Sequence, residues 1–294
     1  MLDSTSTTPE RTALPAGTRL GKVELTVTDL DRSLEFYERS VGLVTQRREG
    51  TRAALGAGGE ELLELGANAD ARRPGRHAGL YHVALLHPSR LELARAAARL
   101  ALTDTPIDGA SDHGISEAIY LPDPDGNGIE LAADRPREVW PDLSEMAGGP
   151  APLDLEDLLG LLDEPPPPRA DPAVTVGHVH LHVDDLDAAR RFYCDVLGFE
   201  LVTRLPSALF VAAGGYHHHL GLNTWRGDGI PPAPPGVVGL NYFTILVPGA
   251  KELAGVGTRL AAGGWIEEAA ESVLARDPAG IGVLIRTDEA RSPR

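Results

Sequence analysis

The sequence predicts an α+β fold made of four repeated βαβββ modules, and three observations support this prediction. First, the segments that begin at Gly21 and Gly177 align without a gap, as GKVELTVTDLDRSLEFYERSVGL and GHVHLHVDDLDAARRFYCDVLGF. Second, a weaker pair of matching segments begins at Gly79 and Gly239. Third, each segment of the weaker pair runs on to a D-P-x-G sequence, which is typical of a hairpin turn.

Each module has the same predicted order of elements. A strand comes first, because Val and Leu occupy alternate positions after Gly21 and after Gly177. A helix follows, with an Asp-Leu-Asp sequence as its cap and a glycine near its end. In the second and fourth modules, turns at Asp123 and Asp277 lead into the last strand. The predicted modules span about 20–67, 78–134, 174–226 and 237–288.

A chain of 294 residues is long enough for two domains. We expect modules one and two to form a first domain over 18–134, and modules three and four a second over 174–290. Residues 1–17 are interpreted as a disordered tail. The linker over 135–173 is rich in Pro and Gly, and its leucines have helical spacing in LDLEDLLGLLDE. That spacing favours a short helix packed at the domain junction over a helix that binds a partner.

Composition excludes several classes of function. A net charge of −16 argues against a nucleic acid or an anionic membrane as a partner, because both require clustered Lys and Arg. No apolar run approaches the ~20 residues of a membrane span, and the N-terminus has no apolar signal core. The single cysteine, Cys194, rules out an internal disulfide framework and fits a reducing cytoplasm. We interpret it as buried rather than reactive. A homo-oligomer is compatible with the sequence, which does not determine the oligomeric state.

The most informative motif is HGISEAIYLPDPDGNGIE, from His113 to Glu130. It resembles the signature of extradiol ring-cleaving dioxygenases, which belong to the glyoxalase/bleomycin resistance/extradiol dioxygenase (vicinal oxygen chelate) superfamily. The resemblance implies that His113 acts in acid–base chemistry or substrate binding, that Tyr120 contacts the substrate and that Glu130 ligates iron. Ser111 departs from the pattern, which usually has Gly, Asn, Thr, Ile or Val there. Over its whole length the chain is most similar to two-domain bacterial catechol-2,3-dioxygenases.

The resemblance implies two vicinal-oxygen-chelate domains with curved mixed sheets. In this fold two modules enclose one pocket, and metal ligands come from the first and last strand of each module. The candidates on the first strands of modules one to four are Lys22, His82, His178 and Tyr242. The candidates on the last strands are Leu62, Glu130, His218 and Leu284.

These candidates predict which modules pair. Pairing one with two, or three with four, brings together no set of two histidines and a carboxylate. Pairing two with three joins His82, His178 and Glu130, with His218 beside them. Tandem glyoxalases of this superfamily pair modules in the same crossed way. We therefore expect crossed pairing of modules 2+3 and 1+4, with all the chemistry in one site and a metal-free pocket in the other.

Each histidine also has an interpretation without function. His82 alone is compatible with a core histidine bonded to backbone, and Glu130 with a solvated strand end. His178, His180 and His182 alternate along one face of a strand, where three histidines are hard to satisfy as core, so we expect at least one to be functional. The matched register selects His178.

The run HHH over 217–219 is open to two interpretations. It could be an adventitious metal patch, or it could supply an active-site histidine from within a strand that follows Gly214-Gly215. The resemblance selects His218. A one-residue shift of register would instead turn His217 or His219 inward.

The resemblance implies meta-cleavage of a catechol with O₂, an activity of aromatic catabolism that yields a ring-opened muconic semialdehyde. The implied cofactor is Fe(II), with Mn(II) as the alternative, held by His82, His178 and Glu130. These ligands leave the site with little net charge, so a catecholate can bind. His218 fits the general base, while His113 and Tyr120 would hydrogen-bond the substrate oxygens.

Other functions share this fold. A metal-dependent glyoxalase-like lyase or isomerase more often has a second glutamate where this chain has His218. A metal-dependent thiol transferase of the antibiotic-resistance type is usually a single two-module chain. A non-catalytic small-molecule-binding protein of the bleomycin-sequestering type would lack a complete triad. The sequence favours the dioxygenase, and it does not identify the ring substituents of the catechol.

Overall fold

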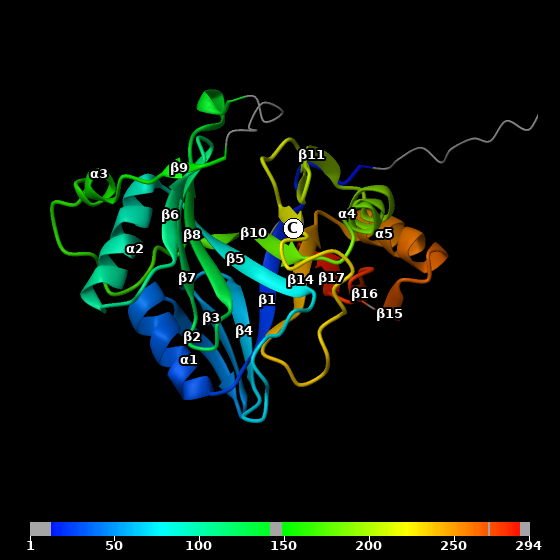
Figure 1. The fold of residues 1–294 in the computed structure, drawn as a ribbon, viewed down its shortest axis with the longest axis horizontal. Coiled ribbons are helices and arrows are strands. Elements are labelled where there is room, and N and C mark those ends of the chain that lie inside the picture. The colour runs from blue at the N-terminus through cyan, green and yellow to red at the C-terminus, as the bar shows by residue number, and fades with distance from the viewer. Residues whose placement is uncertain (1–12, 142–148, 270, 289–294) are drawn as a thin grey trace, which may run out of the picture.

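A computed structural model describes residues 13–141, 149–269 and 271–288 of the chain. In these residues the strands form two mixed sheets. The first sheet has the order β15-β16-β17-β14-β1-β4-β3-β2, and the second has the order β11-β12-β13-β10-β5-β8-β7-β6-β9. Figure 1 shows the helices α1 and α2 on one side of the molecule and α4 and α5 on the opposite side.

The described strands fall within the predicted modules except β9, which lies in the predicted linker and pairs with β6. In the first sheet they are Ile266–Ala269 (β15), Ser272–Arg276 (β16), Gly282–Thr287 (β17), Gly239–Val247 (β14), Arg19–Val27 (β1), Glu61–Ala67 (β4), Arg52–Gly56 (β3) and Val44–Glu49 (β2). In the second sheet they are Glu200–Leu205 (β11), Ala208–Ala212 (β12), Leu220–Asn223 (β13), Thr175–His182 (β10), Gly79–His87 (β5), Gly128–Asp134 (β8), Ser116–Pro122 (β7), Gly109–Asp112 (β6) and Ala151–Pro152 (β9).

The sheet topology confirms the predicted fold class and the crossed pairing of modules. The first strands of modules one and four, β1 and β14, pair antiparallel, and so do those of modules two and three, β5 and β10. Modules one and four therefore share one sheet, and modules two and three share the other. Each module contributes a parallel pair between its first and last strand, as in β5 with β8 and β10 with β13.

The helices form where the sequence places caps. They are α1 (Leu30–Phe36), α2 (Arg90–Leu102), α3 (Leu155–Leu159), α4 (Leu186–Arg190) and α5 (Ala250–Ala262), and a π-helical turn extends both α1 and α4. Asp29 and Asp185 accept backbone N–H groups at the starts of α1 and α4. Gly42 and Gly198 end the two extensions with φ of 87° and 102°, a left-handed conformation that favours glycine.

Two buried tyrosines connect consecutive modules through the hairpin aspartates. The Tyr37 hydroxyl of module one donates to Asp123 of module two, at 3.1 Å, and the Tyr193 hydroxyl of module three donates to Asp277 of module four, at 2.9 Å. The extension of α1 also contacts α2, and the extension of α4 contacts α5. Modules that are consecutive in sequence thus meet through helices and hairpins. The crossed pairs, one with four and two with three, meet by sharing a sheet.

The tail and linker are only partly described. Residues 1–12 and 142–148 lie outside the described residues. Leu14, within the predicted tail, is buried, and its N–H donates to the carbonyl of Gly198. The linker contains the predicted short helix as α3, which contacts α2 and buries Leu158. Cys194 is buried, as predicted.

Among the described helices, none combines the length and the apolar character that a membrane crossing requires.

Candidate metal centre

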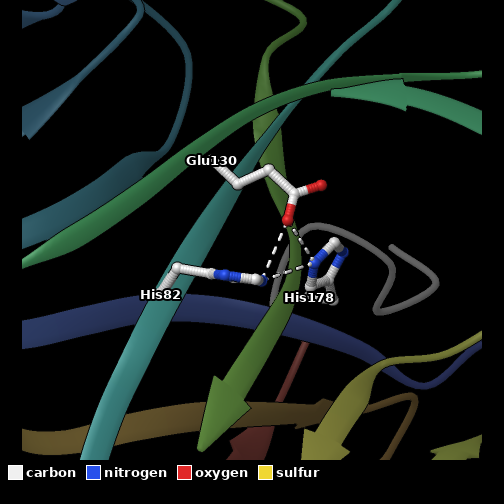
Figure 2. A group of neighbouring side chains, drawn as sticks. All are labelled: His82, Glu130 and His178. Carbon is white, nitrogen blue, oxygen red and sulfur yellow. Dashed lines mark hydrogen bonds and ion pairs between the residues drawn. The ribbon is translucent and has the colours of Figure 1, made fainter. Parts of the chain in front are cut away.

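Three donor side chains converge from three adjacent strands of the second sheet. His82 lies on β5, Glu130 on β8 and His178 on β10, and Figure 2 shows the three pointing at one another. The Nε2 atom of His82 is 2.9 Å from Oε2 of Glu130 and 3.2 Å from Nε2 of His178, which is 3.1 Å from the same carboxylate oxygen. Adjacent strands bring the three together because β5 pairs with both β8 and β10.

The protonation states of this group suit a metal. All three side chains are buried. Burial alone would raise the pKa of Glu130, but the charges and hydrogen bonds of His178 and His82 hold it well below its usual range. Burial lowers the pKa of His82 against the opposing effect of Glu130, which favours a neutral imidazole. An ionised carboxylate and a neutral imidazole are the forms that bind metal.

The donor spacing also fits a divalent first-row ion. Bonds of about 2.1 Å at right angles would place neighbouring donors about 3 Å apart, close to the separations between the three atoms in this group. Two histidines and one carboxylate on one face of an ion leave the other positions open for substrate. Among the described residues, this is the one group of His, Cys, Asp and Glu side chains with the spacing to hold a metal.

The donor group opens into a cavity of about 450 Å³, which His113, Tyr120 and His218 also line. Nε2 of His113 is 2.7 Å from the Tyr120 hydroxyl, so the two predicted substrate-binding residues form one hydrogen-bonded pair. Burial lowers the pKa of His113 and raises that of Tyr120, which favours the neutral form of both. A neutral pair of this kind can donate to a substrate oxygen and accept from it.

The histidine run precedes strand β13 instead of lying inside it, so the sequence-based expectation of a strand was wrong. His217 and His218 both line the cavity. His219 turns away, and its Nδ1 accepts the N–H of Ala213 at 3.2 Å. Burial holds the pKa of His218 well below its usual range, and its ring centroid is 4.2 Å from that of His178.

Strand register revises the candidates on the last strands. Glu130 pairs with Ala84, two residues beyond His82, and Leu284 pairs with Thr244, two residues beyond Tyr242. By the same rule the position in module three is Gly221, which pairs with His180. A Cβ at Gly221 would lie 2.8 Å from Cγ of His180, so the imidazole of His180 takes the space of a fourth side chain.

The matching position in module one is Glu64, which pairs with Glu24, and Leu62 lies in the core. The Lys22 ammonium forms ion pairs with Glu61, at 2.8 Å, and with Glu64. Arg52 joins Glu64 to Glu24 at 2.8 and 2.7 Å. The surroundings of Lys22 are therefore an ionic network.

Sequence reasoning missed Asp134, which binds His217 and so reaches the cavity wall. Its Oδ1 is 2.9 Å from Nε2 of His217, and its Oδ2 accepts the Tyr216 hydroxyl at 2.7 Å. Asp134 ends β8 four residues after Glu130, so alternation along the strand could have placed the two on one face. His180 lines the cavity, while His182 bonds Asn223 through Nδ1 at 2.7 Å.

Two proteins named as dioxygenases are similar to this chain in sequence. A catechol-2,3-dioxygenase from Bacillus subtilis (strain 168) is 42% identical over 276 residues, which cover 91% of this chain and 96% of that protein. A biphenyl-2,3-diol 1,2-dioxygenase 3 from Rhodococcus globerulus is 32% identical over 73 residues, which cover 25% of this chain and 38% of that protein.

Solved structures share the fold at low identity. A structure from Bacillus subtilis subsp. subtilis str. 168 has a TM-score of 0.67 at 14% identity and covers 95% of this chain and 87% of its own. Glyoxalase I from Zea mays has a TM-score of 0.58 at 19% identity, with 92% of each chain covered. The family model described as glyoxalase/bleomycin resistance protein/dioxygenase superfamily matches residues 19–131 and 175–282. The chain belongs to this superfamily.

Proposed function

We propose that the protein is an extradiol ring-cleaving dioxygenase that uses Fe(II) and O₂ for meta-cleavage of a catechol-type substrate. The observation that carries the proposal is the buried group of His82, His178 and Glu130, with the spacing of a facial triad, at the base of a cavity. Similarity to the Bacillus subtilis catechol-2,3-dioxygenase over most of both chains supports the same reaction class.

In this proposal the three donors hold the metal, which when bound would bring catecholate and O₂ together and allow electrons to pass between them. His218 acts as the general base that takes a hydroxyl proton from the catechol, because burial keeps its imidazole neutral. The His113–Tyr120 pair hydrogen-bonds a substrate oxygen and holds the ring in place. Apolar cavity walls keep water from the reacting atoms.

The geometry favours this activity over a four-ligand lyase site. Such a site requires a ligand at the fourth strand position, and here that residue is Gly221. His218 reaches the cavity from the loop before β13.

The test uses metal-free protein reloaded anaerobically with Fe(II). Addition of catechol and O₂ should consume oxygen and form the yellow muconic semialdehyde in equal amounts. Parallel samples with Mn(II) and Zn(II) identify the metal. The proposal is wrong if no catechol is consumed with either redox metal, or if the product is the colourless dicarboxylic acid of cleavage between the hydroxyl groups.

A further inference from the structure

The cavity wall carries no positive charge among the described residues. Neither lysine nor arginine is among the described residues that line it. Among the described lining residues the one carboxylate is that of Glu130, whose oxygen already contacts His82 and His178.

Apolar side chains line the cavity together with the donor group. They come from β11, from β12 and from the chain just before β7 and just after β13, and they are Ile115, Val202, Leu205, Phe210 and Trp225. The Trp225 ring is 52% exposed and stands 5.2 Å, between centroids, from both Tyr81 and His180. A cavity of about 450 Å³ falls in the size range of pockets that hold ligands larger than a single ring.

The lack of positive charge in the cavity wall and its apolar side chains together favour one kind of substituent on the catechol ring. A carboxylate arm would lose its hydration here, because no lysine or arginine among the described lining residues could replace it. An alkyl or aryl arm would instead bury apolar area against Phe210 and Leu205.

On the basis of the proposed function, we propose that the substrates are catechols with a neutral apolar substituent and that catechols with a carboxylate arm are discriminated against. The test compares kcat/KM for 4-ethylcatechol and dihydroxybiphenyl with kcat/KM for protocatechuate and dihydroxyphenylacetate. The carboxylated compounds should be at least about tenfold poorer.

Leu205→Arg places a cation in the cavity wall and should reduce the difference in kcat/KM between the neutral and the carboxylated catechols. Leu201→Arg is the matched control, because Leu201 lies on the same strand, is 41% exposed and does not line the cavity. Equal kcat/KM for both classes in the wild type, or an equal change in both variants, overturns the inference. If no catechol is turned over, the proposed function fails. Quenching of Trp225 fluorescence then still tests whether the neutral catechols bind more tightly than the carboxylated ones. Trp225→Phe is the control that lacks this fluorescence.

A second inference rests on a different observation, the hydrogen-bonded chain from Asp134 through His217 to His218. Asp134 Oδ1 is 2.9 Å from Nε2 of His217, and Nδ1 of His217 is 2.8 Å from Nδ1 of His218. The side chain of His217 is 1% exposed and that of Asp134 is 22% exposed.

If His217 is a neutral imidazole, the chain of bonds sets where the protons lie. The carboxylate of Asp134 can only accept, so Nε2 of His217 carries a proton and donates it. In neutral His217 the other nitrogen, Nδ1, is then an acceptor, which requires Nδ1 of His218 to carry a proton. Nε2 of His218, a residue that lines the cavity, is then the unprotonated nitrogen.

We infer that Asp134 and His217 are positioning residues that hold His218 in the tautomer with Nε2 unprotonated, the form that a general base needs. This inference rests on the proposed function. Asp134→Asn should lower kcat about tenfold and leave iron content and KM unchanged. In the His218→Ala background the same change should have no further effect on kcat, because the residue it acts through is gone.

Tyr216→Phe is the matched control, because it removes the other hydrogen bond to Asp134 and leaves the chain to His218 intact. An equal fall in kcat from Asp134→Asn in both backgrounds would show a structural role and overturn the inference. Imidazole ¹⁵N shifts of His218 test the tautomer without activity. They should report a proton on Nδ1 in the wild type, and a proton on Nε2 instead would contradict the inference even in a protein that cleaves no catechol.

Discussion

The two sheets have the same module plan, yet only one gathers metal donors at the matched positions. Where the second sheet has His82, His178 and Glu130, strand register places Tyr242, Lys22 and Leu284 in the first sheet. The backbone thus supplies equivalent positions twice, and the side chains alone decide which set can bind an ion.

The first sheet contains its own positive charges in place of a metal. The Lys22 ammonium lies beside Glu61 and Glu64, and Arg52 joins Glu64 to Glu24. Burial alone would raise the pKa of Glu64, but hydrogen bonds from Lys22 and Arg52 hold it below its usual range. Cations of the chain itself therefore already pair with these carboxylates, whereas the described ion-pair partners of Glu130 are the imidazoles of His82 and His178.

The largest expected effect is loss of metal when the carboxylate of the second sheet is removed. Glu130→Ala should abolish iron binding at micromolar free iron, because two imidazoles alone hold Fe(II) weakly. Leu284→Ala, the matched change in the first sheet, and Glu64→Ala, which removes a buried carboxylate of that sheet, should leave iron content unchanged. Metal analysis after gel filtration decides, and full occupancy in the Glu130 variant would refute the assignment of this ligand.

The next effect is on rate. His218→Ala should keep iron and fold, yet turn over catechol roughly 10²–10⁴ times more slowly, as expected when a general base is lost. Iron content and oxygen consumption are measured on the same sample. Metal lost in step with activity would make His218 a ligand, and unchanged turnover would remove it from catalysis.

A smaller effect should follow from breaking the ionic network of the first sheet. Lys22→Met removes the positive charge that pairs with the partly buried carboxylates of Glu61 and Glu64. We therefore expect a loss of about 1–2 kcal/mol in the free energy of unfolding. Iron content and kcat should not change. Chemical denaturation of the iron-loaded protein measures the free energy of unfolding. Any fall in iron content would show that the two sheets are not independent.

The last expected effect is a difference between the two hairpin aspartates in how stability depends on pH. Burial raises the pKa of Asp277 to about 7, against hydrogen bonds from Ile281 and Tyr193, compared with about 3.9 in the unfolded chain. The folded protein therefore binds more protons between these values, and Asp277 makes stability fall as the pH rises through that window.

Asp277→Asn should remove this part of the pH dependence, measured as the free energy of unfolding at about pH 5 and about pH 8. Asp123→Asn is the comparison. Its pKa is also raised by burial, but the Asn127 side chain donates to it, a contact that Ile281 cannot make in module four. A larger flattening of the pH profile in the Asp123 variant would contradict this account.

The repeats made the fold and the crossed pairing predictable. The ungapped match between Gly21 and Gly177 sets the modules in register, and only one pairing then joins His82, His178 and Glu130. Two details depended on information that the sequence does not contain. Side-chain alternation predicts which face of the sheet a residue occupies, but the pairing of strands decides which residue lies beside it. The sequence therefore pointed to Leu62, whereas strand pairing places Glu64 at the matched position, beside Glu24.

The second detail is the histidine run. Gly214 and Gly215 both adopt positive φ, at 62° and 68°, and turn the chain out of the sheet before His217. Alternation therefore does not apply to residues 217–219, and both His217 and His218 reach the cavity. Asp134 was missed because its role depends on a contact between modules two and three that only the folded chain brings together.

The most direct test of the central claim is a crystal structure of the iron-loaded protein with anomalous diffraction collected at the iron edge. The account predicts one iron per chain, bound by Nε2 of His82, Nε2 of His178 and the carboxylate of Glu130, between strands of modules two and three. An iron bound in the first sheet beside Lys22 and Glu64, or one held by His217 or His218 in place of Glu130, would contradict it.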